Sequence, residues 1–102
     1  MLFILSIEII FLGPISEELF FRGFIYNFLK KKLDWKSAVI ITSIVFAFLH
    51  SSIWGFFIVF ILSIGICYIY EKTRNIVSAI VFHSLYNTLS LVNILILKFF
   101  MK

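Results

Sequence analysis

The residues best suited to chemistry form a small polar group within long apolar stretches: Glu8, Glu17, Glu18, Arg22, His50, His83 and Asn87. A carboxylate beside two imidazoles can activate water as a general base, and imidazole and amide groups can stabilise an oxyanion. Two histidines and a glutamate can also ligate zinc, as in some peptidases. The sequence contains neither a Gly-x-Ser-x-Gly elbow nor a His-Glu-x-x-His motif. Water-mediated hydrolysis is therefore the first chemical hypothesis.

The spacing of these residues places them on shared helix faces. Three pairs stand four residues apart: Glu18 with Arg22, Phe46 with His50, and His83 with Asn87. Residues at this spacing are neighbours on a helix surface, so an ion pair is predicted within the first of these pairs. Glu8 belongs to no such pair, and we assign it no role.

The composition predicts a membrane protein. The chain has 102 residues, of which 63% are hydrophobic and 14% charged, and its mean hydropathy is +1.14. A soluble domain of this size cannot bury so much apolar surface. The composition therefore excludes a soluble globular domain, a disordered segment and a nucleic-acid-binding module. The single cysteine, Cys67, lies in an apolar run and is predicted to be a buried thiol.

Charged segments divide the chain into apolar stretches that are too long and too uniform for barrel strands: Met1–Leu29, Ser37–His50, Ile53–Tyr70 and Ile76–Leu97. An all-α, polytopic transmembrane bundle of about four helical segments is predicted. Gly13-Pro14 predicts that the first stretch is a kinked helix or two helices. Ser37–His50 is short for a full crossing, so we expect residues 51–55 to lie inside the protein.

The polar residues are predicted to converge at one depth. Measured from the nearest basic residues at about 1.5 Å per residue, Glu17 and His50 lie roughly 20 Å along their helices and His83 roughly 13 Å. Charges at bilayer depth are costly and face a protein interior or a cavity. One buried polar site, assembled from three stretches, is therefore expected.

The basic residues predict the orientation. Lys30, Lys31, Lys32, Lys36, Lys72 and Arg74 fall in loops expected on one side, whereas only Lys98 and Lys102 fall on the other. The positive-inside rule places the lysine-rich side in the cytoplasm. The net charge of +4 is therefore interpreted as a topology signal, and no nucleic-acid partner is expected.

Three short motifs of the sequence resemble those of the CPBP family, also called the Abi or CAAX-protease-like family. Its members are intramembrane proteases related to type II CAAX prenyl endopeptidases. Residues 17–23, Glu-Glu-Leu-Phe-Phe-Arg-Gly, resemble the family's EExxxR motif. Residues 46–50 match FxxxH and residues 83–87 match HxxxN, in the family's order. Each motif alone is weak, but the three in order within an apolar chain are a strong signal.

The resemblance implies a role for each matching residue. Glu17 is similar to the base that activates water, assisted by His50. His83 and Asn87 resemble the oxyanion-stabilising pair. Glu18 and Arg22 resemble the supporting ion pair, and Phe46 resembles the aromatic spacer of the second motif.

The function expected from this resemblance is hydrolysis of a peptide bond in a membrane-associated protein or peptide, in the membrane of a bacterial cell. The alternative is a self-immunity protein against bacteriocins, or a membrane scaffold, that does not need proteolysis. We expect no metal cofactor, with zinc as the alternative. Prenylated proteins, bacteriocin precursors and other membrane peptides stay open as substrates, and so does completion of the bundle by a homo-oligomer.

Family members usually carry further helices before the first motif, which here begins at residue 17. We therefore expect residues 1–102 to form a single catalytic core that lacks upstream helices or is a minimal form. The first residues lack a basic segment and a small-residue cleavage site, so they are not interpreted as a signal peptide.

Overall fold

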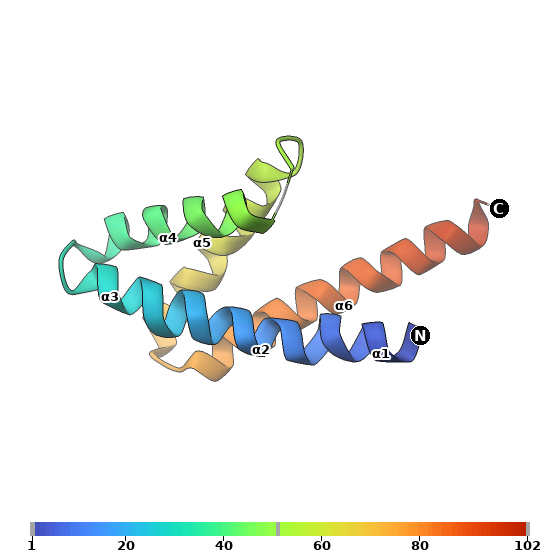
Figure 1. Cartoon of the computed structure of the whole chain (residues 1–102), viewed down its shortest axis with the longest axis horizontal. Coiled ribbons are helices and arrows are strands. Elements are labelled where there is room, and N and C mark those ends of the chain that lie inside the picture. The colour runs from blue at the N-terminus through green and yellow to red at the C-terminus, as the bar shows by residue number, and fades with distance from the viewer. Residues whose placement is uncertain (1, 51, 102) are drawn as a thin grey trace.

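The computed structural model describes residues 2–50 and 52–101, and within these ranges the chain is helical with short connections and no strand. The two ends of the chain lie toward one end of the molecule, and the connection at residues 31–34 lies at the other (Figure 1). The molecule measures 51 × 27 × 20 Å. The predicted all-α bundle of about four helical segments is confirmed.

The first apolar stretch forms one continuous helical run that alternates between α-helical and wider π-helical turns. Its segments are α1 (Leu2–Ile7), the π-helical η1 (Glu8–Leu12), α2 (Gly13–Glu18), the π-helical η2 (Leu19–Tyr26) and α3 (Asn27–Lys30). Of the two expected forms, two separate helices is wrong, because the run is continuous and a π-helical turn takes up the disturbance at Gly13-Pro14.

The π-helical turn before Pro14 has a clear physical cause. The proline ring clashes with the carbonyl four residues back in a regular α-helix, and a wider turn relieves that clash. The Gly13 N–H accordingly bonds to the Glu8 carbonyl, five residues back. A side chain at Gly13 would meet the Glu8 carbonyl oxygen at 2.9 Å, so glycine is required at this position.

Three further helices follow: α4 (Trp35–His50), α5 (Phe56–Thr73) and α6 (Ile76–Phe100). Asp34 caps α4, since its carboxylate accepts from the Ser37 N–H at 3.4 Å and also from the Ser37 hydroxyl at 2.6 Å. Asn75 caps α6 by accepting from the Val77 N–H. These caps allow the chain to reverse direction within a few residues.

Small side chains allow α4 and α5 to pack closely. Ala38, Thr42 and Ala47 of α4 and Ser63 and Cys67 of α5 are fully buried. Small residues let helix backbones approach without a need for interhelical hydrophobic attraction, which lipid does not provide. The predicted burial of the Cys67 thiol is confirmed.

The connection between α4 and α5 differs from the expectation. Helix α5 begins at Phe56, whereas the apolar pattern placed the start at Ile53. Ile53 and Trp54 are 86% and 92% exposed, so the expectation that residues 51–55 lie inside the protein was wrong for these residues. Residue 51 lies outside the described part of the chain.

Two helices, α5 and α6, are long and apolar enough to cross a membrane, and α4 is a shorter apolar helix. Large apolar side chains such as Phe57, Ile61, Leu89 and Phe99 are mostly exposed on these helices. Exposure of such a continuous apolar surface to water is unfavourable, whereas contact with lipid acyl chains is not. The chain is therefore a membrane protein.

Candidate active site

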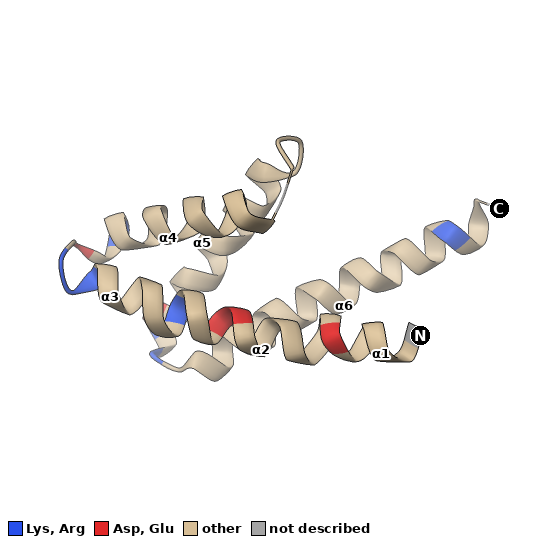
Figure 2. Ribbon diagram, in the orientation of Figure 1, with Lys and Arg blue, Asp and Glu red and all other residues tan. Residues whose placement is uncertain are grey.

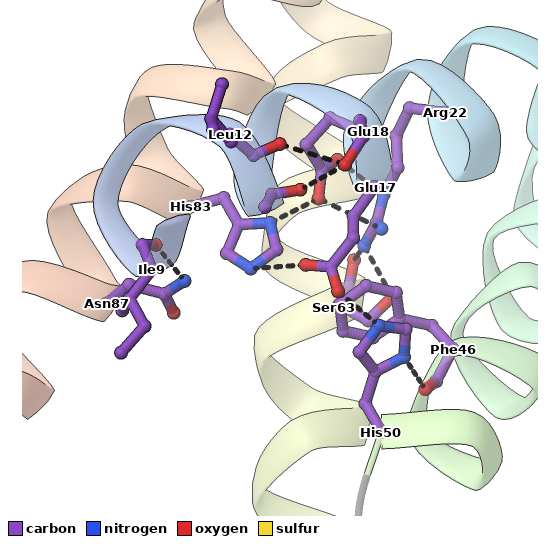
Figure 3. Close-up of polar contacts among 12 residues, drawn as sticks. Ile9, Leu12, Glu17, Glu18, Arg22, Phe46, His50, Ser63, His83 and Asn87 are labelled. Atoms are coloured by element: carbon purple, nitrogen blue, oxygen red, sulfur yellow. Dashed lines mark hydrogen bonds and ion pairs between the residues drawn. The ribbon is translucent and has the colours of Figure 1, made fainter. Parts of the chain in front are cut away.

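Polar side chains from distant parts of the sequence meet where the first helical run packs against the other helices, α2 against α6 and η2 against α4, α5 and α6 (Figure 3). Glu17 and Glu18 come from α2, His50 from α4 and His83 from α6. The convergence predicted from residue spacing is present in the structure.

The innermost part of this cluster is an ion pair without solvent contact. Glu18 and Arg22 are both fully buried, and the Arg22 Nε lies 3.3 Å from a Glu18 carboxylate oxygen. The guanidinium also donates to the Ser63 hydroxyl and, at 2.9 Å, to the Ser63 carbonyl. Because a buried guanidinium stays charged, Glu18 must be ionised to balance it.

His83 links this ion pair to Glu17. Its Nδ1 lies 2.7 Å from the Glu18 carboxylate, and its Nε2 lies 3.5 Å from Glu17 Oε1. An ionised carboxylate can only accept, so Nδ1 carries the proton and donates it to Glu18. The Nε2 therefore faces Glu17 as a lone pair in neutral His83, and it becomes a donor only when His83 takes a second proton.

Glu17 and His50 share a proton. His50 Nδ1 lies 2.8 Å from the Phe46 carbonyl, which can only accept, so Nδ1 is protonated. His50 Nε2 lies 2.7 Å from Glu17 Oε2. This distance is a hydrogen bond only if one proton lies between the two atoms, on either the imidazole or the carboxylate.

With His83 in its neutral form the cluster carries no net charge, because Arg22 balances Glu18 and the Glu17–His50 pair is neutral as a unit. Zero net charge suits a site at bilayer depth, where an unbalanced charge is costly.

Phe46 is the aromatic centre around which the cluster packs. Its ring stacks on that of His50 with the centroids 4.2 Å apart, and it contacts the His83 ring edge-on at 5.9 Å. The Arg22 guanidinium lies over the same ring, 4.7 Å from its centroid. The ring is 2% exposed, so it fixes the two imidazoles and keeps water from the Arg22 side.

A pocket of about 240 Å³ opens beside the cluster, and its lining combines polar and apolar side chains: Glu17, Phe46, His50, Val59, Leu62, His83, Tyr86 and Asn87. The Glu17 side chain is 32% exposed and that of His50 is 26% exposed, in contrast to Glu18. The pocket is large enough for water, and it places Glu17 at the boundary between water and the buried ion pair.

The Asn87 side chain forms a hydrogen bond with the helical turn before Pro14. In the π-helical pattern of η1, the N–H after that of Gly13 would belong to Pro14 and would bond to the Ile9 carbonyl. Pro14 has no N–H, and the Asn87 amide donates to the Ile9 carbonyl at 2.9 Å instead. The amide nitrogen carries a second hydrogen, and Asn87 also lines the pocket.

The structure thus brings all six predicted site residues into one region, with Glu18 and Arg22 behind Glu17, His50, His83 and Asn87. Sequence reasoning missed Ser63, Phe21 and the Ile9 carbonyl. Ser63 could have been found, because it is a polar residue within an otherwise apolar run. Phe21, whose ring lies 5.0 Å from that of Phe46, has no such signal.

The cluster does not have the geometry of a metal site. Two ligands on a tetrahedral zinc stand about 3.3 Å apart, given Zn–N bonds of about 2.0 Å. His50 Nε2 and Glu17 Oε2 are closer than this, at 2.7 Å, because they bond to each other. Among the described residues, no group of three His, Cys, Asp or Glu side chains is arranged to hold a metal ion.

Comparison with known protein families supports the motifs. Residues 1–89 match the model of the type II CAAX prenyl endopeptidase Rce1-like family. The chain belongs to this Rce1-like family. The match covers all three motifs, so their co-occurrence reflects common ancestry rather than chance.

Two curated relatives of this Rce1-like chain come from Lactococcus lactis. It is 36% identical to the UPF0177 protein YxdF over 75 residues, which are 72% of this chain and 41% of the relative. It is 29% identical to the UPF0177 protein YbdJ over 86 residues, which are 83% of this chain and 37% of the relative. The chain thus spans about two fifths of the length of these relatives. No solved structure matches it.

Proposed function

We propose that this protein is an intramembrane endopeptidase that hydrolyses a peptide bond of a membrane-associated protein or peptide through water activated by Glu17. The observation that carries the proposal is the contrast between two neighbouring carboxylates. Glu18 is locked between Arg22 and His83, whereas Glu17 faces a pocket and shares a proton with His50.

In the proposed reaction, Glu17 Oε1 accepts a proton from a water molecule, and the water oxygen bonds to the carbonyl carbon of the scissile peptide. With the shared proton on His50, its Nε2 donates to Glu17 Oε2 and orients the carboxylate. The proton then passes from Glu17 to the leaving nitrogen as the C–N bond breaks. One water molecule is consumed for each bond cleaved.

The negative charge that develops on the peptide oxygen needs donors in the pocket. The second amide hydrogen of Asn87 is one donor, and His83 Nε2 is another when it is protonated. No metal is needed for these steps, and the direct hydrogen bond between Glu17 and His50 supports the metal-free form of the proposal.

We further propose that the chain crosses a bacterial cell membrane several times, with its lysine-rich end in the cytoplasm. Two apolar helices of spanning length and the bacterial relatives support this arrangement. The substrate class follows the family's description, so prenylated peptides are the first candidates, ahead of other membrane peptides.

The proposal is tested by replacing Glu17→Gln, which keeps the size of the side chain and removes its basicity. Cleavage of a panel of prenylated and unmodified membrane peptides by the purified protein should fall about 10²–10⁴-fold. The matched control is Glu8→Gln, the same change on the same helical run outside the pocket, which should keep full activity.

Two results would overturn parts of this mechanism. Equal activity of Glu17→Gln and the native protein would rule out Glu17 as the base. Loss of native activity with a chelator, restored by zinc, would replace the metal-free mechanism. A self-immunity protein or scaffold would instead tolerate Glu17→Ala and His83→Ala in a test of producer immunity.

A further inference from the structure

A second polar cavity lies at the lysine-rich end of the molecule, apart from the proposed active site. It has a volume of about 560 Å³ and is lined by Gly23, Asn27, Lys30, Lys31 and Arg74. These residues come from η2, α3, the connection between α3 and α4, and the connection between α5 and α6, and none of them lines the pocket of Glu17. A volume of this size is typical of pockets that bind small molecules.

Two of the three cations of this cavity are paired with one acidic residue. A single Glu71 carboxylate oxygen lies 2.6 Å from Lys30 Nζ, 3.5 Å from an Arg74 guanidinium nitrogen and 2.6 Å from the Tyr26 hydroxyl. Three cations thus line the cavity against one neighbouring carboxylate, which leaves a net positive charge, and Lys31 forms no ion pair with the described part of the chain.

Arg74 stands in an unusual backbone conformation. It follows the last turn of α5 with φ 55° and ψ 29°, and its N–H bonds to the Tyr70 carbonyl at 2.7 Å. Glycine is the usual residue at such a position, because a side chain is strained in this left-handed conformation. Arg74 thus contributes a cation to the cavity lining from the short connection between α5 and α6.

The cavity lies where a membrane surface would be. The basic loops after α3 and after α5 both lie at the end of the molecule opposite its termini (Figure 2). Both loops directly follow apolar helical segments, so their cations stand at the boundary between acyl chains and water. Basic pockets between transmembrane helices at this level suit phosphate headgroups.

We propose that this cavity binds the phosphate headgroup of an anionic membrane phospholipid. Lys31 and Arg74 contact the phosphate oxygens, and Lys30 stays paired with Glu71. This binding does not depend on the proposed peptidase activity, and its test measures lipid retention rather than cleavage.

The experiment compares retention of phosphatidylglycerol and phosphatidylcholine by the full chain in neutral detergent, measured by native mass spectrometry. The native protein is expected to prefer phosphatidylglycerol. The double variant Lys31→Gln/Arg74→Gln should lower the affinity for this lipid about 30-fold. The matched control, Lys32→Gln/Lys36→Gln, removes the same charge from the same end of the molecule outside the cavity and should change it less than about 3-fold.

A further variant is expected to raise the affinity for phosphatidylglycerol instead of lowering it. Glu71→Gln removes the carboxylate that competes for Lys30 and Arg74, so phosphatidylglycerol should bind about 5-fold more tightly. Equal losses in the two double variants would mean diffuse attraction to the surface and would overturn the proposal. Binding of inorganic phosphate without a preference between the two lipids would assign the cavity to a soluble anion instead of a lipid.

Discussion

Glu17 and Glu18 are identical neighbours in the sequence, yet the fold gives them opposite surroundings. Glu18 has no solvent contact and lies between Arg22 and His83, whereas the Glu17 side chain is 32% exposed and faces a pocket. Consecutive residues on a helix point about 100° apart, so one side chain reaches the interior while the next reaches the opening.

The same chemical group thus has different chemical properties in the two places. A carboxylate with a fixed cation and no access to water stabilises the arrangement of helices. A carboxylate beside an imidazole and a pocket can exchange protons with a substrate or with water. The inner pair therefore serves the structure, and the outer pair is proposed to serve the reaction.

The largest expected effect on stability comes from the inner carboxylate. Glu18→Gln leaves the buried Arg22 guanidinium without its counter-charge, and the free energy of unfolding should fall by about 3 kcal/mol or more. Glu17→Gln, the same change one residue earlier, should lower it by less than about 1 kcal/mol, because the Glu17–His50 pair is partly exposed. Denaturant titration of both variants in detergent micelles measures the difference.

The control is the double variant Glu18→Gln/Arg22→Gln, which removes both buried charges and should be more stable than Glu18→Gln alone. Equal losses of stability for Glu17→Gln and Glu18→Gln would contradict the assignment of separate functions to the two carboxylates.

A smaller effect is expected at the turn that positions both glutamates. Asn87→Leu leaves the Ile9 carbonyl without a donor and should lower the free energy of unfolding by about 1–2 kcal/mol. In a Pro14→Ala background the backbone regains an N–H, so the same change should cost clearly less. A double-mutant cycle measures this coupling, and strictly additive effects would show that the Asn87 amide does not replace the missing Pro14 N–H.

The smallest effect on stability is expected at an exposed carboxylate outside the site, that of Asp34. The hydrogen bond from the Ser37 hydroxyl holds the pKa of Asp34 below its ordinary value. Its contribution to stability is therefore complete above about pH 4 and is lost as the pH falls through the lowered pKa of the folded state. Asp34→Asn keeps a helix cap and should remove this small pH dependence of the unfolding temperature. An unchanged pH dependence in the variant would argue against the cap.

The sequence anticipated much of the fold because the dominant force is visible in the composition. Apolar stretches separated by basic loops predict membrane helices, and the described helices lie close to the predicted stretches. The exceptions have local causes. Pro14 widens a turn instead of breaking the helix, and residues 53 and 54 extend outward because α5 begins only at Phe56.

The amino-acid order alone indicates which polar groups are available and roughly at what depth they lie, since helix rise converts residue number into height. Only the tertiary structure decided which carboxylate is sealed and which is open, that Ser63 and Phe46 complete the surroundings of Arg22, and that Asn87 takes over the bond missing at Pro14. The reason is physical: rotation of each helix about its axis and contacts between segments distant in the chain depend on how all side chains pack together, and no local pattern encodes them.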